Sequence, residues 1–506
     1  MIVQELNAEE KKRYRRLEYI PGILIWTTFA AVIILSFVQP YWAIIFIIAF
    51  DLYWMMRIFY LLVYLLTSYK RLKENIKIDW MNQLRDLQDW ERVRHLIVLP
   101  TYKEEFEIID GTFEALIKSR YPLKKMIAVL AGEERDEENF KKIAARISAK
   151  YGDYFYKLLI TIHPKNTPGE VAAKGANIHW AGHRAQEFID QAKIPYRDII
   201  VSCFDIDTIV HRQYFAALAF QYLTHPNPLR TSFQPIALYN NNIWDSPALM
   251  RVVANSTSFW LLTELVRPER LFTFSSHSMS FQALVDVGFW DNTIVTEDSR
   301  IFLQCFLRYD GDYKVTPLYM PVSMDTVMGK TLRRSLVNQY KQQRRWAWGV
   351  EHLPFMIWNF RKNPSISKSL KLRYLWILTE GMYSWATAPI LIFILGWLPL
   401  AVSNTFYNNI SGSVLAQNAP KVLETLMRIG MLGLFASAII STVLLPPKPY
   451  TKRLIKYAEM ILQWILFPVC MIAFGSIPAI ESQTRLMLGK YLGFWVTEKS
   501  RKGLTR

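Results

Sequence analysis

Long apolar runs near both ends of the chain flank a central stretch in which short apolar runs alternate with polar ones. Ile20 to Val38 is almost wholly apolar, and Tyr41 to Leu66 forms a second such run. Because a helix needs about 20 mostly apolar residues to cross a bilayer, the two runs predict a pair of membrane spans within residues 1–73. Asp51 and Arg57 interrupt the second run and are expected to face a protein partner or to reach toward the headgroups.

Basic residues flank this pair of spans on both sides. Residues 1–19 are polar and basic, and a basic segment follows at 69–73. Since Lys and Arg accumulate on the cytoplasmic side of membrane helices, we expect the N-terminus and the central region in the cytoplasm and the protein in the cell (inner) membrane. The leader is long and charged and no small-residue cleavage site follows it, which indicates a retained anchor and not a signal peptide.

Residues 351–506 become apolar again. One span is predicted within Tyr374 to Val402 and another within Leu423 to Leu445. A last run, Ala458 to Ile480, contains two prolines and a glycine. As a plain span it would place the basic tail at 499–506 outside, against the positive-inside tendency, whereas a broken or re-entrant hairpin would not. Both alternatives stay open, so the sequence predicts four to six membrane segments.

The central residues 74–350 alternate between apolar strands and helical patterns. Helices are expected over Glu104 to Lys118 and Asp136 to Lys150. The expected strands are His95 to Leu99, Met126 to Leu130, Leu158 to Ile162 and Ile199 to Phe204. Strands that are apolar on both faces indicate a buried, mostly parallel sheet with helices on both sides, an α/β fold. In such sheets ligands bind beyond the carboxyl ends of the strands.

Two carboxylates, Asp205 and Asp207, follow the fourth expected strand. Alternation along an extended chain would place both on one side, where oxygen ligands suit Mg²⁺ or Mn²⁺ together with substrate phosphates. A metal there would neutralise a departing nucleotide diphosphate. A solvated acidic turn is the more common explanation of an isolated Asp-x-Asp, but the position after a buried strand favours the metal.

A second acidic motif, Thr296-Glu297-Asp298, precedes the helical run Ile301 to Leu307. Thr296 suits the N-cap of that helix, and acids in a first turn suit the helix dipole. The same position suits catalysis, because a sugar hydroxyl is a poor nucleophile until its proton is removed as it attacks. Asp298 is therefore predicted to act as a general base, with Glu297 beside it in the catalytic set.

A third motif, Gln342-Gln343-Arg344-Arg345-Trp346, lies in an expected helix over Thr331 to Val350. Residues three or four apart share a helix face, so Gln342, Arg345 and Trp346 are expected to face one cleft. The Arg345 guanidinium suits a phosphate, and the Trp346 ring suits a sugar ring. The alternative is a basic amphipathic helix that rests on lipid headgroups.

Further candidates lie at the starts of helices and the ends of strands. Lys174 opens a helical run that also contains Asn177, and helix N-termini attract phosphate. The residues that end the first two expected strands, and that are candidates for lining a nucleotide pocket, are Thr101, Tyr102, Glu104 and Glu133.

The net charge of the chain limits the classes of binding partner that the sequence favours. The chain carries 60 Lys and Arg against 43 Asp and Glu, a formal charge of +17. No helix-turn-helix, zinc-finger or RNP motif accompanies this excess, so an anionic membrane face or a phosphorylated substrate explains it better than nucleic acid. Cys203, Cys305 and Cys470 are scattered without a CxxC pattern, which disfavours a disulfide framework and favours a reducing compartment.

Taken in order, five motifs between residues 95 and 350 resemble those of membrane-embedded family 2 glycosyltransferases of the cellulose, chitin and hyaluronan synthase type. The motifs are Pro-Thr-Tyr-Lys-Glu (100–104), Lys-Gly-Ala-Asn (174–177), Asp-Ile-Asp (205–207), Thr-Glu-Asp (296–298) and Gln-Gln-Arg-Arg-Trp (342–346). The resemblance implies a GT-A (Rossmann-like) fold, a UDP-sugar donor, Mg²⁺ or Mn²⁺, and an inverting single displacement.

The resemblance also implies roles for single residues. Asp207 would bind the metal-diphosphate, and Asp298 would be the base. The acceptor and diphosphate site would consist of Gln342, Arg345 and Trp346. The nucleotide would contact Thr101, Tyr102 and Lys174. The expected product is a growing β-linked polysaccharide. The alternatives are single addition to a lipid or short glycan and, in another class, a non-catalytic membrane scaffold or transporter.

Two features depart from the family pattern. Where the family has Asp-Asp-Gly or Asp-Asp-Ser after the second strand, this chain has Gly132-Glu133-Glu134-Arg135-Asp136. The predicted membrane segments are also fewer than in the polymer-secreting members, which implies single addition, a partner pore or a homo-oligomer.

Overall fold

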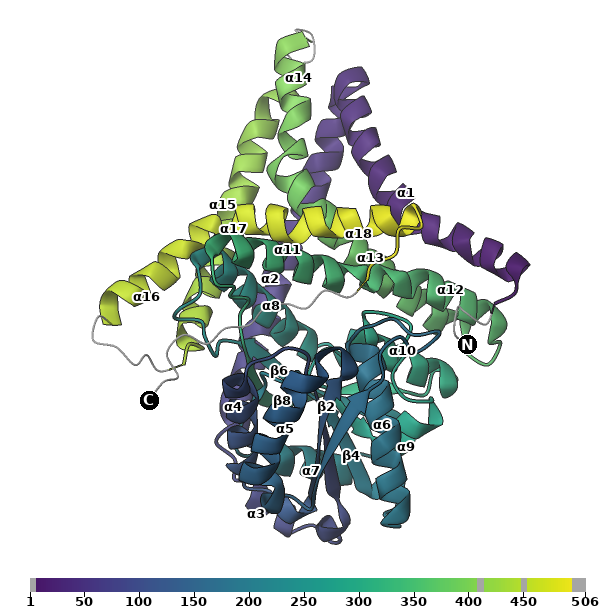
Figure 1. The fold of residues 1–506 in the computed structure, drawn as a ribbon. Helices are drawn as coiled ribbons and strands as arrows, with labels where there is room; N and C mark the ends of the chain where they lie inside the picture. Colours follow the sequence, from purple (N-terminus) through teal and green to yellow (C-terminus); the bar gives the residue numbers. More distant parts are fainter. Residues whose placement is uncertain (1–5, 407–413, 447–452, 494–506) are drawn as a thin grey trace.

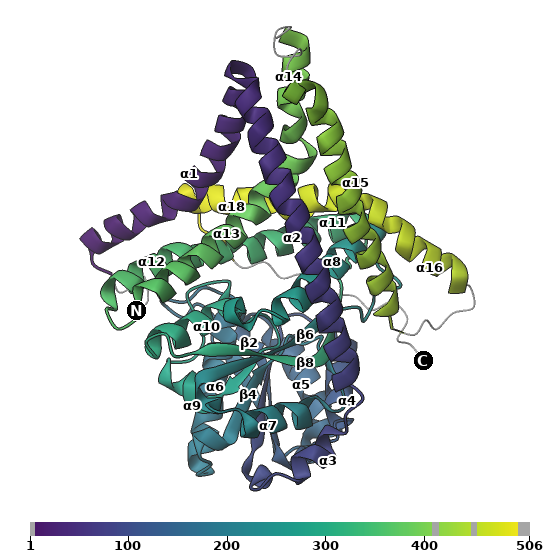
Figure 2. The same cartoon turned by 180° about the vertical axis from the view of Figure 1, so that it is seen from behind.

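The computed structural model describes residues 6–406, 414–446 and 453–493, and the basic tail at 499–506 lies outside them. An α/β unit lies below two helical hairpins that rise from the same side of it (Figure 1 and Figure 2). The hairpins consist of α1 (Ala8–Val38) with α2 (Pro40–Asn75), and α14 (Leu398–Phe406) with α15 (Val414–Val443).

One sheet of eight strands forms the centre of the α/β unit, in the order β3-β2-β1-β4-β7-β6-β8-β5. The strands are β1 (Arg94–Pro100), β2 (Met126–Glu133), β3 (Lys157–His163), β4 (Ile199–Cys203), β5 (Ile209–Val210), β6 (Thr231–Tyr239), β7 (Ser278–Ser280) and β8 (Lys314–Met324). The four predicted strands are β1 to β4, and they pair in parallel. The other half is mixed, because β7 runs antiparallel to β4 and β6 while β6 and β8 are parallel.

Helices cover both faces of the sheet, as the apolar strands predicted. One core contains Ile97 and Leu99 of β1. It is covered by α3 (Trp80–Arg85), α4 (Phe106–Ile117), α5 (Glu137–Tyr151) and α7 (Tyr214–Thr224). The other core contains Leu96 and Val98 of the same strand. It is covered by α6 (Lys174–Gln191), α9 (Phe281–Asp286) and α10 (Glu297–Arg308). Successive residues of β1 thus enter opposite cores, as the period of a strand requires.

A layer of helices lies between the sheet and the upper part of the hairpins (Figure 1), while α2 continues beside the sheet, where Arg71 donates to the hydroxyl of Tyr319 on β8 at 2.8 Å (Figure 2). The layer consists of α8 (Ala248–Leu265), α11 (Leu332–Ala347), α12 (His352–Lys362) and α13 (Lys368–Phe393). Above it runs a segment made of α16 (Arg453–Leu462), α17 (Phe467–Cys470) and α18 (Ile477–Met487). A 3₁₀ turn at Gln463–Leu466 and a π-helical stretch at Met471–Ser476 join its pieces.

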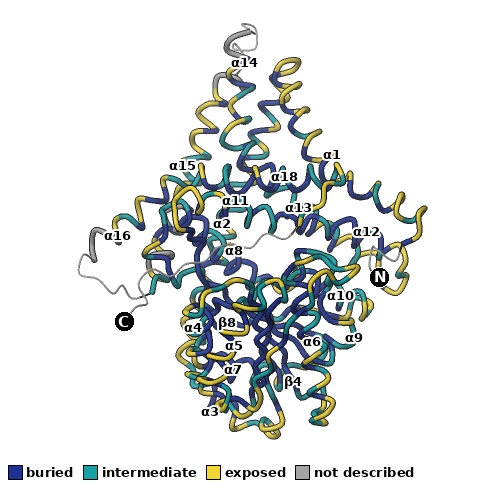
Figure 3. Tube along the Cα trace, in the orientation of Figure 1, coloured by how far each residue is buried: buried dark blue, intermediate teal, exposed yellow. Residues whose placement is uncertain are grey.

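Within the described residues, four helical stretches are long and apolar enough to cross a membrane, or five if one bent pair counts as a span. They are Ala8–Val38, Pro40–Asn75, Asn418–Ile440 and Tyr457–Met487, and the bent pair is Lys368–Phe393 with Leu395–Val402. The hairpins expose much of their outer surface (Figure 3), and large apolar side chains such as Trp42 and Met56 of α2 lie there. Apolar surface of this extent is compatible with a membrane protein.

Candidate active site

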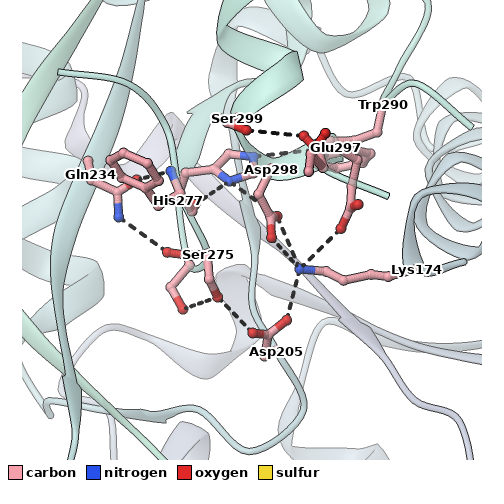
Figure 4. Close-up of polar contacts among 12 residues, drawn as sticks. Lys174, Asp205, Gln234, Ser275, His277, Trp290, Glu297, Asp298 and Ser299 are labelled. Carbon is pink, nitrogen blue, oxygen red and sulfur yellow. Dashed lines mark hydrogen bonds and ion pairs between the residues drawn. The ribbon is translucent and has the colours of Figure 1, made fainter. Parts of the chain in front are cut away.

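Three of the sequence motifs meet at the amine of Lys174, the first residue of α6. Its Nζ lies 2.8 Å from Asp205 Oδ1, 2.8 Å from Asp298 Oδ2 and 3.7 Å from Glu297 Oε1 (Figure 4). Burial disfavours the charge on Lys174, but the nearby carboxylates of Asp205 and Asp298 outweigh it and raise its pKa well above the ordinary value. Lys174 is therefore a fixed cation among three carboxylates.

The close approach of α6 to the acidic motif depends on Gly175. A Cβ at this position would lie 2.7 Å from the carbonyl oxygen of Asp291 and 3.3 Å from Cβ of Glu297. Since real Cβ atoms essentially never come as close as 2.7 Å to another atom, any other residue would push the start of α6 away. The glycine thus brings Lys174 within reach of Asp298.

The Asp205-Ile206-Asp207 segment does not run extended, so the predicted alternation of its carboxylates is wrong. The chain turns at Ile206 and Asp207, and the backbone N–H of Thr208 donates to the carbonyl of Asp205 at 3.0 Å. The Asp205 carboxylate contacts Lys174, and its Oδ2 accepts from the hydroxyl of Ser275 at 2.9 Å. A turn satisfies backbone groups locally, and it sends the two side chains to different partners.

Asp207 is completely buried, and its Oδ2 accepts a hydrogen bond from the backbone N–H of Asp325 at 2.9 Å. The amide of Asn241 links the same two residues by donating to the Asp207 carbonyl at 3.0 Å and to Asp325 Oδ1 at 2.9 Å. Nothing in the sequence around Asp325 indicated this contact, because it joins the end of β8 to the loop after β4.

The carboxylates near the loop after β4 are oxygen donors of the kind that a divalent cation binds. Among the described residues, no group of three or more His, Cys, Asp or Glu side chains is arranged to hold a metal. Mg²⁺, however, is usually bound through one or two carboxylates, with substrate phosphates and water completing its shell. The oxygen donors of Asp207 and Asp325 fit that pattern in chemistry, whereas both oxygens of Asp205 contact Lys174 or Ser275.

Glu297 and Asp298 differ in exposure although they are neighbours. The Glu297 side chain is buried, and neither of its carboxyl oxygens accepts a hydrogen bond from any residue that the structure describes. Burial and the adjacent charge of Asp298 raise the pKa of Glu297, against the opposing effect of Lys174 and Arg345. The Asp298 side chain keeps 20% of its surface exposed. Asp298 is thus the carboxylate of this pair that a substrate can reach.

His277 is fixed in place by hydrogen bonds on both of its ring nitrogens. Its Nε2 accepts from the indole N–H of Trp290 at 3.2 Å, so its Nδ1 carries the proton and donates to the carbonyl of Phe274 at 2.9 Å. Burial lowers the pKa of His277. The neutral ring lies next to Asp298, with Nδ1 3.8 Å from Oδ1.

Thr296 occupies the predicted N-cap position of α10 but does not cap the helix with its side chain. Its hydroxyl donates instead to Glu351 Oε1 at 2.6 Å, and the indole N–H of Trp348 donates to Glu351 Oε2 at 2.8 Å. One residue beyond the acidic motif, the Ser299 hydroxyl contacts His352 Nε2 at 2.8 Å. The segment that follows α11 therefore holds both ends of the motif that contains Asp298.

The Gln-Gln-Arg-Arg-Trp motif on α11 borders the same site. The ring of Trp346 lies 5.9 Å from the ring of Tyr239 at the end of β6. Burial raises the pKa of Tyr239, and the charges of Asp205, Asp207 and Asp298 raise it further while Arg345 lowers it. Gln342 Oε1 accepts from the neighbouring Gln339 at 3.4 Å. Tyr239 thus lies beside Trp346 and within the electrostatic influence of Arg345 and of the carboxylates of the other motifs, although no sequence signal marked it.

The candidates for the nucleotide end gather where β1 and β2 end. The carbonyl of Ala131 accepts from the backbone N–H of Thr101 and from the side-chain amide of Asn177, each at 2.8 Å. Glu104 Oε2 accepts from the Thr101 hydroxyl at 2.8 Å and from the Tyr102 N–H at 2.5 Å. Thr101, Tyr102 and Asn177 therefore lie together at the carboxyl edge of the sheet.

Glu133 ends β2 beside this group. Its Oε2 accepts from Nε of Arg135 at 2.8 Å, and the Arg135 guanidinium lies 4.6 Å from the centre of the Tyr102 ring. Burial raises the pKa of Glu133, and Arg135 partly opposes that shift. Arg135 is an additional residue of this edge that the sequence did not mark as functional.

Comparison with solved structures finds distant resemblances. A mannosyltransferase from Pyrobaculum calidifontis, in complex with GDP-Man and Mn²⁺, is 15% identical; the match covers 78% of this chain and 98% of that chain, with a TM-score of 0.42. Residues 1–349 of TarS from S. aureus are 12% identical over 74% of this chain and 92% of that chain, with a TM-score of 0.36. The same TarS fragment in complex with UDP-GlcNAc is 10% identical over 79% of this chain and 93% of that chain, with a TM-score of 0.37. A search of curated protein sequences gives no match.

The family comparison is more direct. A family described as glycosyl transferase family group 2 matches residues 200–474, which is more than half of the chain. The matched region begins in β4 and includes the Asp-Ile-Asp, Thr-Glu-Asp and Gln-Gln-Arg-Arg-Trp motifs. It agrees with the α/β sheet and with the GT-A fold that the motifs predicted. The chain belongs to glycosyl transferase family group 2 and is an enzyme of that class, a glycosyltransferase.

Proposed function

We propose that this glycosyltransferase works at the cytoplasmic face of the membrane and transfers a sugar, with inversion and with the help of Mg²⁺ or Mn²⁺, from a UDP-sugar to a growing β-linked polysaccharide. One observation carries the proposal: Asp298 is a partly exposed carboxylate in a cluster with Lys174 and Asp205, and Tyr239 lies beside Trp346 within the electrostatic influence of that cluster. A base, a fixed cation and an aromatic platform thus border one site.

The chemistry follows from the positions of these groups. Asp298 takes the proton of an acceptor hydroxyl while its oxygen attacks the anomeric carbon of the donor. The bond from that carbon to the diphosphate oxygen breaks on the opposite side, so the configuration inverts in a single displacement. The electron pair leaves with the nucleoside diphosphate. Lys174 keeps its cationic charge beside the base throughout and, together with Arg345, stabilises negative charge in the site.

The leaving diphosphate needs positive charge that the loop after β4 does not supply. Asp207 would hold Mg²⁺ or Mn²⁺, with Asp325 nearby as a second oxygen donor. When bound, the metal would neutralise charge on the diphosphate as the bond to the sugar breaks. Lys174 and Ser275 keep the Asp205 carboxylate in place beside this loop.

The nucleotide would lie at the carboxyl ends of β1 and β2. Thr101, Tyr102, Glu104, Glu133 and Asn177 border this edge and would contact the base and ribose. The acceptor glycan would approach from the side of α11, where Gln342, Arg345 and Trp346 lie, between the catalytic unit and the membrane.

The main test is the variant Asp298→Asn, assayed in purified protein with a panel of nucleotide sugars and Mg²⁺ or Mn²⁺. We expect loss of transfer with unchanged donor binding, because the amide keeps the shape of the side chain but cannot accept the proton. Asp153→Asn, on the exposed surface beside β3, is the matched control and should transfer at the wild-type rate. Retained turnover in Asp298→Asn would contradict the proposal.

The length of the product tests whether the enzyme builds a polysaccharide. A ladder of long products on a sizing gel supports a growing polysaccharide, and a single added sugar on a lipid or short glycan contradicts that part of the proposal while leaving the role of Asp298 intact.

A further inference from the structure

The last apolar segment of the chain has the length of a membrane span but not the orientation of one. Tyr457–Met487 is 31 residues long and passes as a span by length and composition. In two views related by a half turn, α16, α17 and α18 nevertheless run across the foot of the two hairpins and not alongside them (Figure 1 and Figure 2). The segment is broken, as its two prolines and glycine allowed, and it crosses the direction of the hairpins.

One face of this segment is apolar and exposed. Leu462, Ile465 and Val469 expose 63%, 76% and 55% of their surface, and Ile477 further along exposes 44%. The spacing of three and four residues places the first three on one side of the helical path. These three large aliphatic side chains form an apolar stripe, with Ile477 exposed further along, and such a stripe is unusual on a surface that faces water.

The opposite face is fastened to the protein by polar contacts and by apolar packing, in which Cys470 and Phe474 join a core with Met250 of α8. Gln463 Oε1 accepts from Nε of Arg251 on α8 at 2.6 Å. The ring of Trp464 stacks on Phe259 of the same helix, with ring centres 5.8 Å apart and planes 7° apart. Further along, the hydroxyl of Ser476 donates to a carbonyl of α13 at 3.3 Å. The segment thus has a protein-bound side, which carries its polar groups, and an apolar, exposed side.

The bound side also holds the helix that contains the Gln-Gln-Arg-Arg-Trp motif. Glu481 of α18 forms an ion pair with Arg344 at 2.6 Å and accepts a hydrogen bond from the hydroxyl of Tyr340 at 2.7 Å. The Ser482 hydroxyl donates to the carbonyl of Arg344 at 2.8 Å. A spanning helix would carry these polar groups into hydrocarbon, where each would be costly.

The same segment contacts a hairpin where that hairpin leaves the protein. The indole N–H of Trp26 on α1 donates to the hydroxyl of Thr484 at 3.0 Å. A Cβ on Gly22 of α1 would lie 2.7 Å from Cβ of Met487, so the two helices pack very closely there. The segment therefore packs against α1 at one end and, through α16, against α15 at the other, and both helices belong to the hairpins that are fit to cross a bilayer.

We propose that residues 457–487 lie flat in the headgroup region of the membrane, with Leu462, Ile465, Val469 and Ile477 in contact with lipid and the opposite face holding α11. A helix with one apolar and one polar face binds a bilayer in this orientation. The inference concerns the membrane surface of the protein and does not depend on which sugar is transferred. It assigns the segment to the interface and removes it from the set of spans.

Depth measurements test the orientation. Single cysteines at Leu462→Cys, Ile465→Cys, Val469→Cys and Ile477→Cys are labelled with an environment-sensitive fluorophore, and the full chain is placed in phosphatidylcholine–phosphatidylglycerol nanodiscs with lipids brominated at known depths. The native Cys203, Cys305 and Cys470 are buried, so the unmodified protein gives the background. We expect all four positions to be quenched at one shallow depth, at the boundary of headgroups and acyl chains.

Two results would overturn the proposal. A spanning helix rises about 1.5 Å per residue, so positions 462 and 477 would differ in depth by about 22 Å. A segment that faces water would show no quenching at any of the four positions. Tyr154→Cys, exposed in the turn between α5 and β3 of the α/β unit, is the matched control and should not be quenched.

Discussion

The ammonium group of Lys174 lies 2.8 Å from the Oδ2 atom of Asp298, so the proposed base is held by a cation from another motif. Replacing Lys174 with Met should leave three carboxylates without a counter-ion, of which Glu297 is buried. Removing one partner from a buried ion pair costs about 3–5 kcal/mol, and about 2–3 kcal/mol is expected here because Asp205 and Asp298 are partly exposed. The melting temperature in detergent should fall accordingly.

A double-mutant cycle shows whether the effect belongs to this pair. Adding Asp298→Asn to Lys174→Met removes one uncompensated charge and should recover part of the lost stability. Strictly additive losses would mean that Lys174 and Asp298 do not interact in solution.

Gly175→Ala should impair the enzyme more than the addition of one methyl group would suggest. The added Cβ would meet the Asp291 carbonyl at 2.7 Å, so the start of α6 must move and carry Lys174 with it. Overpacking of this kind typically costs about 1–3 kcal/mol, and the displacement of Lys174 should also lower kcat. Gly152→Ala is the matched control, since a Cβ there meets nothing within 4 Å. Equal melting temperatures and equal kcat for the two variants would refute the close approach.

Glu351 gives the protein a pH-dependent stability. Burial raises the pKa of Glu351 to about 7, against the opposing effects of Arg300 and of the hydrogen bond from Thr296. The folded state therefore holds this proton more tightly than the unfolded state, and the associated stability, full below pH 4.5, is lost as pH rises through about 7. Since Glu351→Gln cannot ionise, its melting temperature should rise relative to wild type between pH 5 and pH 8. A difference that stays constant over this range would argue against the shift.

Trp346 should matter for the acceptor and not for the donor. The variant Trp346→Ala removes the ring beside Tyr239, and we expect a rise in acceptor KM or a shorter product with unchanged donor affinity. Trp346→Phe should retain part of the function, because a smaller aromatic surface remains. Trp180→Ala, beside the edge strand β3, is the control. Weakened donor binding in Trp346→Ala would place the ring at the wrong end of the site.

Asp207 should be needed for metal-dependent donor binding. In Asp207→Asn the side-chain oxygen can still accept the hydrogen bond from the Asp325 N–H, so the loop should keep its shape while it loses the charge. Calorimetry with UDP and Mn²⁺ should show an affinity about 10–100-fold lower, and a chelator should produce a similar loss in wild type. Donor binding that is indifferent to both changes would exclude the proposed metal role.

The strands that sequence patterns revealed are those made of short aliphatic runs, whether they are buried throughout like β1 and β2 or lie partly exposed at the sheet edge like β3. β1 to β4 are short runs of aliphatic residues, whereas the remaining strands lack that signal. β6 and β8 contain Pro235, Pro317 and Pro321, and proline normally argues against a strand inside a sheet. β7 is Ser278-Met279-Ser280, in which buried hydroxyls replace an apolar run. Tertiary pairing, and not local propensity, makes these segments strands.

The residues of the candidate site also divide into those that sequence motifs marked and those that they did not. Lys174, Asp205 and Asp298 were visible because each stands in a motif at a strand end or helix start, and the fold brings them together. Tyr239 and Glu351 were not visible, because each reaches the site through a contact between elements distant in the chain. The expected N-cap role of Thr296 failed for the same reason: a partner 55 residues away in the chain takes its hydroxyl.

The hydrogen bond from Thr296 to Glu351 bears on how this enzyme can be dissected. A soluble fragment cut after Val350 would contain every motif and the whole sheet, yet it would end one residue before the side chain that anchors the Thr-Glu-Asp turn. It would also lack Glu481, the partner of Arg344. Such a fragment would also lose Leu353, Phe355 and Met356 from the core that α10 shares, so any weak catalysis would reflect the cut and not the chemistry of the intact protein.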